Sequence, residues 1–150
     1  MTRVCLVGAD DVDLRFELLS RETAREALST YDLSQPYENT LALSTVSVGA
    51  AVSLLNDLNW YLVRYADAAL VRDPSVSETE WLSRDLAEAV RNDDVTPADT
   101  DEYLRLYGVD EGRLVEPLFV RRTDGEVPEY DLREVEETVT VRVTEAEFGG

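Results

Sequence analysis

The stretch from Val48 to Pro74, VGAAVSLLNDLNWYLVRYADAALVRDP, limits the choice of fold more than any other part of the chain. Its apolar residues recur every three or four positions, which predicts one long amphipathic helix. The helix is expected to end before Pro74, because the residue before a proline avoids helical geometry. On this interpretation Leu55 faces the core, Asp57 faces solvent, and Val63 widens the apolar arc. We expect a central core helix, the alternative being a face kept for a partner.

Four shorter segments have the apolar content and length of β-strands. They are RVCLVG (3–8), TLALSTV (40–46), RLVEPLFVRR (113–122) and ETVTVRVTEAEF (137–148). VDLRFEL (12–18) alternates apolar and charged residues, which predicts the second strand of an N-terminal β-hairpin. A helix over residues 11–19, in a βα unit, is the alternative. Pro117 cannot donate to a ladder, so its strand is expected at an edge or with a bulge.

Helix starts are indicated by capping residues before three further segments. They are Ser20 before 21–32, Ser77 with Glu80 before 81–91, and Thr96 with Pro97 before 98–108, where Gly108 is the expected stop. The sequence thus predicts an α/β (α+β) fold, with helices packed on a mixed, largely antiparallel sheet completed by two C-terminal strands. We expect one domain over residues 1–148 and a flexible Gly149-Gly150 tail.

The charge of the chain is strongly unbalanced, with 32 acidic residues against 14 basic ones and a net charge of -18. Every basic residue is Arg, and 44% of the chain is apolar, which is typical of a folded protein with an acidic surface. Self-repulsion at this charge is largely screened near 1 M salt, where the Debye length is about 3 Å. We expect a salt-accumulating halophile with a potassium-rich solvent, although a GC-rich genome would also favour Arg over Lys.

Several segments support the same origin: VCLVGADD, LLSRETAREAL, LNWYLVRYAD and RLVEPLFV. Read together, they resemble a small family of haloarchaeal proteins that carries no assigned function. The resemblance implies the halophilic origin and no active site.

Membrane insertion is not expected, because no stretch reaches 18 uncharged apolar residues. The apolar run at the start of the chain is also too short for a signal peptide. The sequence therefore predicts a cytoplasmic protein. Direct nucleic-acid binding would need a basic stripe, which this chain lacks.

Catalytic and metal sites find little support in the residue types. The chain has no His and one Cys, which excludes the usual zinc sites and His-dependent triads. Cys5 is expected as an inert thiol in a buried strand. LVGADD opens like a nucleotide-binding turn but lacks the later glycines. Two acidic groups could hold a hard cation, but a hydrated surface is favoured and no cofactor is predicted: Asp10, Asp11, Asp13 and Asp93, Asp94, Asp99, Asp101, Glu102.

The remaining candidates are Arg121-Arg122, which could contact an anion or a partner, and Gly149-Gly150, which resembles a ubiquitin-like or sulfur-carrier tail. The function favoured is a non-enzymatic module that binds a protein partner or itself. An enzyme or small-ligand domain, and a modifier acting through the two glycines, are the alternatives. A pocket lined by Trp60, Tyr61 or Arg64 would favour a ligand, whereas a flat apolar patch beside the long helix would favour a partner.

Overall fold

One mixed sheet organises the chain. The computed structural model describes residues 1–123, 125–126 and 137–149. Within these ranges seven strands pair in the order β2-β1-β3-β4-β7-β5-β6. All neighbours are antiparallel except β4 and β7, which confirms the expected fold class. The strands are Thr2–Gly8 (β1), Thr40–Thr45 (β2), Ala66–Arg72 (β3), Trp81–Ser83 (β4), Tyr103–Asp110 (β5), Arg113–Arg121 (β6) and Glu137–Arg142 (β7).

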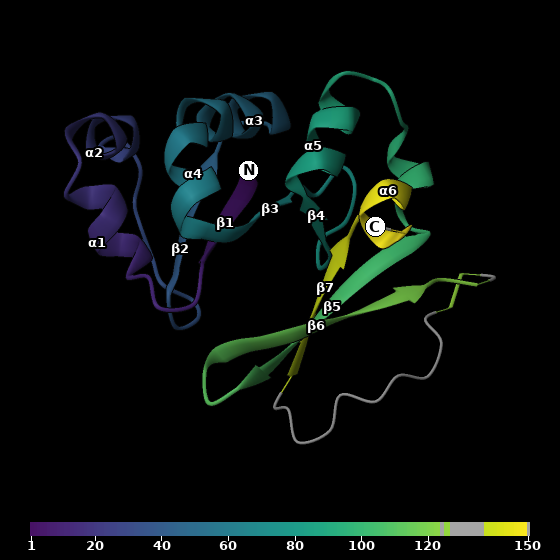
Figure 1. Cartoon of the computed structure of the whole chain (residues 1–150). Helices are drawn as coiled ribbons and strands as arrows, with labels where there is room; N and C mark the ends of the chain where they lie inside the picture. Colours follow the sequence, from purple (N-terminus) through teal and green to yellow (C-terminus); the bar gives the residue numbers. More distant parts are fainter. Residues whose placement is uncertain (124, 127–136, 150) are drawn as a thin grey trace.

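The helices are short and most of them cover one half of the sheet. Figure 1 shows α1 to α5 on one side of the strands and α6 beside β5. The helices are Leu14–Leu19 (α1), Glu22–Leu28 (α2), Val48–Asp57 (α3), Asn59–Tyr65 (α4), Arg84–Arg91 (α5) and Glu145–Gly149 (α6), with a 3-10 turn at Pro97–Thr100 (η1). In the described part of the chain, no helix has the length and apolarity needed to cross a membrane.

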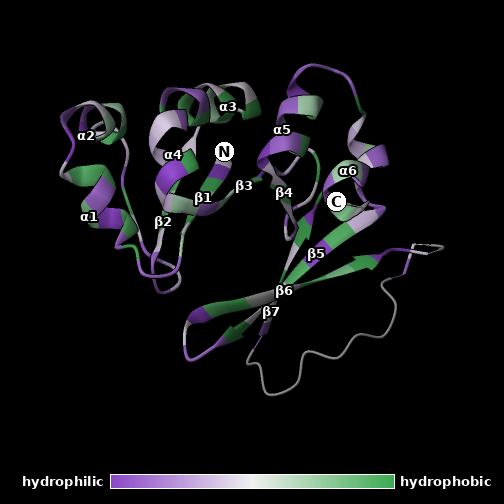
Figure 2. Ribbon diagram, in the orientation of Figure 1, coloured by the Kyte–Doolittle hydropathy of each residue, from purple (hydrophilic) through white to green (hydrophobic). Residues whose placement is uncertain are grey.

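Two hydrophobic cores lie on opposite faces of β1. Val4 and Leu6 pack with the helices, whereas Cys5 and Val7 pack in a second cluster with strands β5 and β7. The sheet therefore curls, so that its C-terminal half closes over the face of β1 that the helices leave open. The Glu38 amide donates to the Gly112 carbonyl (2.8 Å), which joins the segment before β2 to the β5–β6 turn. Figure 2 shows hydrophobic residues along strands β5 and β6.

The N-terminal segment forms a βα unit, and the hairpin interpretation is wrong. Asp13 caps α1 by accepting from the Phe16 amide (3.1 Å). Leu14 and Leu18 lie one turn apart and are fully buried, while Phe16 is 62% exposed. Apolar residues at every second position also include pairs spaced i, i+4, as on one face of a helix. The alternation alone therefore did not distinguish a strand from a helix. Ser20 ends α1, and the cap predicted there is wrong.

The predicted long helix is divided into α3, α4 and β3. Ser47 caps α3, and Leu58 joins α3 to α4 with a non-helical ψ of 0°. The chain becomes extended at Ala66 and pairs antiparallel with β1. In β3, successive side chains enter opposite cores, since Leu70 belongs to one cluster and Val71 to the other. Leu55 is buried and Asp57 exposed, as expected, but Val63 is 70% exposed.

Two capping signals were correct locally, but the elements after them differ from the predicted helices. Ser77 accepts from the Glu80 amide (3.0 Å), yet β4 comes next and α5 begins at Arg84 under a Ser83 cap. Thr96-Pro97 opens only the η1 turn, and the helix predicted over 98–108 is replaced by β5. Burial of both Leu104 and Leu106 has the period of a strand.

The C-terminal strands agree with the sequence pattern. β6 lies at the edge of the sheet, and its two residues Glu116 and Pro117 lie opposite Tyr107 alone, because Leu106 pairs with Leu118 and Gly108 with Val115. Pro117 is therefore both in an edge strand and in a bulge. The strand predicted within 137–148 is β7, and buried residues alternate along it and just beyond it: Val139, Val141 and Val143.

Candidate functional site

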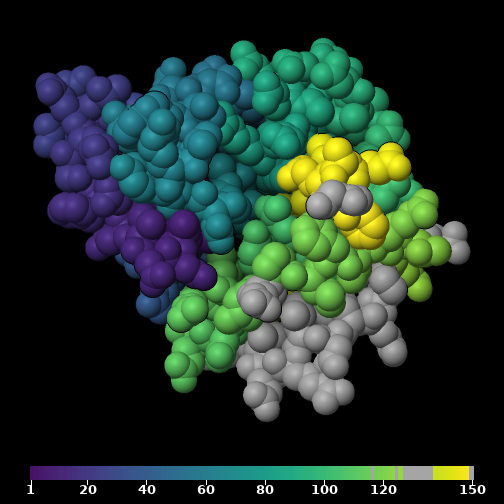
Figure 3. All heavy atoms as spheres, viewed as in Figure 1, coloured from purple at the N-terminus to yellow at the C-terminus, as the bar shows by residue number. Residues whose placement is uncertain are grey.

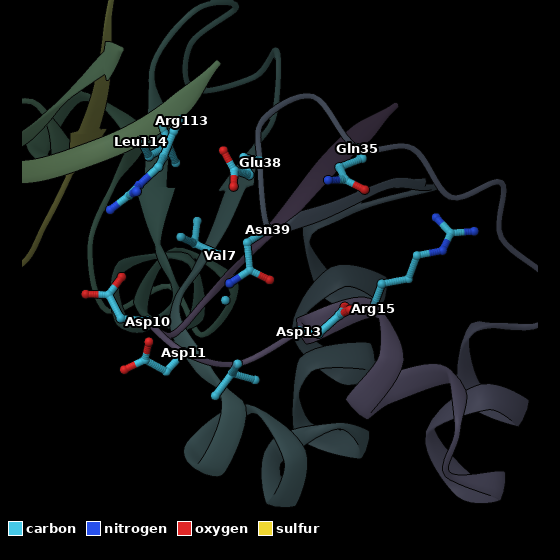
Figure 4. Close-up of a pocket in the computed structure, with 12 residues that line it drawn as sticks. Val7, Asp10, Asp11, Asp13, Arg15, Gln35, Glu38, Asn39, Arg113 and Leu114 are labelled. Atoms are coloured by element: carbon cyan, nitrogen blue, oxygen red, sulfur yellow. The ribbon is translucent and has the colours of Figure 1, made fainter. Parts of the chain in front are cut away.

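A polar cleft of about 750 Å³ is shown in Figure 4. Its walls are the β1–α1 loop, the segment before β2 and the start of β6, which the curl of the sheet brings together. It is lined by Val7, Gly8, Asp10, Asp11, Val12, Asp13, Arg15, Gln35, Glu38, Asn39, Arg113 and Leu114.

Asn39 builds the floor of this cleft. Its carbonyl accepts from the Gly8 amide (2.8 Å), its Oδ1 from the Leu14 amide (3.0 Å), and its Nδ2 donates to the Ala9 carbonyl (3.1 Å). A Cβ atom on Gly8 would lie 2.5 Å from Asn39 Nδ2, so the glycine of LVGADD is required by packing. Sequence reasoning missed Asn39. The residue has a φ of 56°, a region that Asn tolerates better than most residues, so an Asn directly before a predicted strand is the local signal in the sequence.

Charges of both signs line the cleft. In Figure 4 the carboxylates of Asp10 and Asp11 lie on one side, toward which Arg113 extends, while Asp13 and Arg15 lie on the other. The three aspartates are exposed. Across residues 1–123, 125–126 and 137–149, no three His, Cys, Asp or Glu side chains are grouped so as to hold a metal ion.

Cys5 lies in the second core and is 1% exposed. Burial raises the pKa of its thiol to about 11, although Arg3 and Arg72 act in the opposite direction. The thiol is therefore protonated at neutral pH, in agreement with the inert strand position expected from the sequence.

Arg121 and Arg122 both contact acidic residues of the chain itself. Arg121 Nε donates to Glu102 Oε1 at 2.9 Å on the surface. Arg122 is mostly buried, and its Nη2 donates to Glu80 Oε2 at 2.7 Å. An external contact of this pair stays a prediction, and for Arg122 it would compete with Glu80.

Glu80 is the centre of a partly buried ion-pair network. Its other oxygen accepts from Arg142 Nε (2.7 Å), and Arg142 also donates to the Thr100 hydroxyl (2.9 Å). Burial alone would raise the pKa of Glu80, but the hydrogen bonds and charges of Arg122 and Arg142 outweigh it and hold that pKa below its usual value. The network joins the start of β4 to the ends of β6 and β7, which is a structural role.

A different kind of surface lies on α4. Trp60 is 50% exposed and Val63 is 70% exposed. The Arg64 guanidinium lies 3.8 Å from the Trp60 ring centre, and Arg21 lies 5.3 Å from the Tyr65 ring and donates to its hydroxyl (2.8 Å). We call Arg21, Trp60, Val63, Arg64 and Tyr65 the α4 face.

The α4 face lies in a part of the chain that carries almost no acid. Between Glu38 and Asp67, Asp57 is the only acidic residue, although the whole chain has 32. The acidic surface is therefore interrupted over α3 and α4, and Trp60 and Val63 occupy the gap.

The Gly149-Gly150 candidate is only partly within the described residues. β7 ends at Arg142, and Gly149 is the last residue of α6, so a helix rather than a strand precedes it. Phe148 packs α6 against β5, since its ring centre lies 5.1 Å from that of Tyr103. Gly150 lies outside the described residues.

Comparison with known proteins gives one match. The model of a family of unknown function, DUF5804, matches residues 2–109. The chain belongs to this family. No curated protein and no solved structure matches it.

The part of this DUF5804 chain that matches the family runs from β1 almost to the end of β5. It contains the α4 face and most of the cleft. β6, β7 and α6 come after it. The family carries no assigned activity, so function must be argued from these surfaces.

Proposed function

We propose that the chain is a non-enzymatic interaction module that binds an acidic protein partner through the α4 face. The observation that carries this proposal is the half-exposed Trp60, stacked under Arg64, in a part of the chain with almost no acid. The proposal includes a potassium-rich cytoplasm as the place where the module works.

Trp60 and Arg64 have the chemistry of an interface anchor. Trp, Tyr and Arg are the residues most enriched among interface hot spots, where truncation costs at least about 2 kcal/mol. Trp60, Val63 and Arg64 follow i, i+3, i+4 spacing, so they share one helix face. Stacking of Arg64 on the indole ring limits the conformations that binding would otherwise have to restrict.

Charge distinguishes this face from the rest of the surface. In molar salt the net charge of -18 is screened beyond about 3 Å, but carboxylates brought into contact with those of another acidic protein still repel. None of the five residues of the α4 face is acidic, and two of them are arginines; Arg21 already pairs with Glu17 (3.2 Å), whereas Arg64 is stacked on Trp60. Carboxylates at the rim of a partner would pair with them, while an apolar centre would cover Trp60 and Val63.

The test is a photo-crosslinking amino acid placed at Val63 in the protein expressed in its own host. A discrete adduct that disappears in a Trp60→Ala background is expected, because loss of about 2 kcal/mol weakens binding roughly 30-fold. The matched control carries the crosslinker at Glu88, which is exposed on α5. Equal adducts at both positions, or none at Val63, would overturn the proposal.

Sedimentation of the purified chain in about 2 M KCl tells which kind of acidic partner is involved. A second copy gives a dimer that Trp60→Ala dissociates, whereas a different partner leaves the purified chain monomeric and its identity is read from the adduct. In both cases Trp60→Ala should retain the fold, since half of the ring is already in solvent.

A further inference from the structure

A second, smaller cavity lies between α4, the start of α5 and α6. Its volume is about 200 Å³, and it opens on the face of the molecule seen in Figure 3, between α4 and the yellow C-terminal helix. One wall is apolar and includes Leu62, Val63 and Ala69. The other side carries the charged groups of Asp67, Arg105 and Glu147. Ligand pockets typically combine an apolar wall with a few converging polar groups in this way.

Arg105 is the unexplained group in this cavity. It projects from β5, and its guanidinium lies 5.4 Å from the ring centre of Tyr107. Its Nε is buried and has no hydrogen-bond partner among the described residues. Asp67, Asp85 and Glu147 line the same cavity. Within the described ranges, however, no carboxylate oxygen lies within 4.0 Å of a nitrogen of the Arg105 guanidinium. Buried polar groups without partners are rare, and a water, an ion or a ligand can satisfy them.

The other arginine of the cavity differs from Arg105. Arg84 donates to the Leu55 carbonyl (3.3 Å) and to Asn56 Oδ1 (3.2 Å), so its guanidinium already connects α5 to α3. An incoming anion would therefore meet Arg105 rather than Arg84.

The carboxylate of Glu147 is held rigidly at the opposite side. Its Oε1 accepts from the Ser83 hydroxyl (2.6 Å) and from the Thr144 amide (3.0 Å). The Glu147 amide donates back to the Thr144 hydroxyl (3.1 Å), which completes a capping box at the start of α6. Oε2 accepts no hydrogen bond from the residues that the structure describes, so it remains able to receive an ammonium group.

We propose that this cavity binds a small zwitterion of the α-amino-acid class. The ligand carboxylate pairs with Arg105, its ammonium group with Glu147 and Asp67, and an apolar side chain lies on the wall formed by Leu62, Val63 and Ala69. A guanidinium binds a carboxylate through two parallel hydrogen bonds, which accounts for an arginine at this position. The cavity shares Val63 with the α4 face, but the groups that would bind the charges of the ligand, Arg105, Glu147 and Asp67, do not belong to that face.

The experiment titrates the purified full-length protein with L-leucine in about 2 M KCl and follows backbone amide chemical shifts. We expect saturable shifts at residues that line the cavity. N-acetyl-L-leucine, which lacks the ammonium group, and L-leucinamide, which lacks the carboxylate, are each expected to bind at least tenfold more weakly. These two ligands test the wild-type protein directly, so the result does not depend on the folding of a variant.

The Arg105→Gln variant should weaken L-leucine binding at least tenfold, whereas Arg91→Gln should leave it unchanged, because Arg91 is exposed at the end of α5. Absence of saturable shifts would overturn the proposal. So would equal binding of the blocked ligands, or wild-type affinity in folded Arg105→Gln.

Discussion

In the half of the sheet formed by β2, β1, β3 and β4, five helices bury leucine-rich faces against the strands, whereas the half formed by β7, β5 and β6 has only α6. Leucine is the commonest residue of the first core, whereas valine and aromatic side chains make up most of the second. The two halves meet at the β4–β7 pair, the one parallel pair in the described sheet, where only Trp81 and Leu82 pair with Val141 and Arg142.

This short junction is reinforced by charge. Glu80 precedes β4, Arg142 ends β7 and Arg122 comes directly after β6, so the ion pairs connect strands that share few ladder hydrogen bonds. Apolar burial therefore stabilises both halves, whereas the second half is attached to the first by a shared apolar cluster together with a partly buried carboxylate.

The largest effect is expected in the helix-covered core. Leu55→Asp should leave the protein unfolded, because Leu55 is fully buried and an unpaired buried charge costs several kcal/mol out of a total stability of about 5 to 15. Asp57→Ala, on the exposed side, is the control and should melt like the wild type. Circular dichroism measures both, and a folded Leu55→Asp would contradict the assigned core.

Salt should affect both halves together. Lowering KCl from about 2 M to about 0.1 M is expected to abolish the cooperative melt, because a net charge of -18 is then poorly screened. The check is the circular-dichroism melt at each salt concentration. An unchanged melting temperature would show that the acidic surface does not limit stability.

Loss of the carboxylate at the junction should have the next largest effect. Glu80→Gln leaves Arg122 and Arg142 without their anion, which should lower the free energy of unfolding by about 2–3 kcal/mol, because the site is only partly buried. Urea denaturation measures the change. Arg121→Gln is the control, since its ion pair with Glu102 is on the surface and should contribute at most about 1 kcal/mol.

The same carboxylate predicts a pH dependence with a definite sign. Because the folded-state pKa of Glu80 lies below its usual value, its contribution is fully present above the unfolded-state pKa of about 4.3 and is lost as the pH falls through the folded-state pKa. Stability of the wild type should therefore fall more steeply below about pH 5 than that of Glu80→Gln. Parallel curves for the two proteins would rule out this linkage.

The smallest effects are expected at the C-terminal end. Phe148→Ala removes the contact of α6 with Tyr103 and Phe119 and should cost about 1–3 kcal/mol, because Phe148 is only half-buried. Removal of Gly149 and Gly150 should leave the melting temperature unchanged. A larger loss from deleting the glycines than from Phe148→Ala would reverse this order.

Several elements were determined by the sequence alone. The segment RVCLVG indicated the first strand with Cys5 buried in it, and ETVTVRVTEAEF indicated the last strand. Pro117 indicated a strand that is either at an edge or bulged, and β6 is both. In each case the signal is local, because a two-residue period or a missing amide hydrogen acts within a few residues of the chain.

The candidate surfaces were predicted only in part. Trp60 and Arg64 were singled out, but their exposure depends on where α4 ends and which face meets the core. No sequence pattern marked Arg105 as a candidate. Its place in a cavity depends on Glu147, which lies in a different element and is brought to the same cavity by the fold. Sequence spacing carries no information on such contacts.

The tertiary structure decided the secondary structure of Ala66–Arg72 and Tyr103–Asp110. Both segments have helical spacing of apolar residues, but both form strands. β1 is apolar on both faces and therefore lies inside the sheet, where its backbone groups need a neighbour on each side. Ala66–Arg72 supplies one of these neighbours, and its side chains enter both cores. Local helix propensity is worth less than about 1 kcal/mol per residue, so the long-range ladder and the burial of two faces outweigh it.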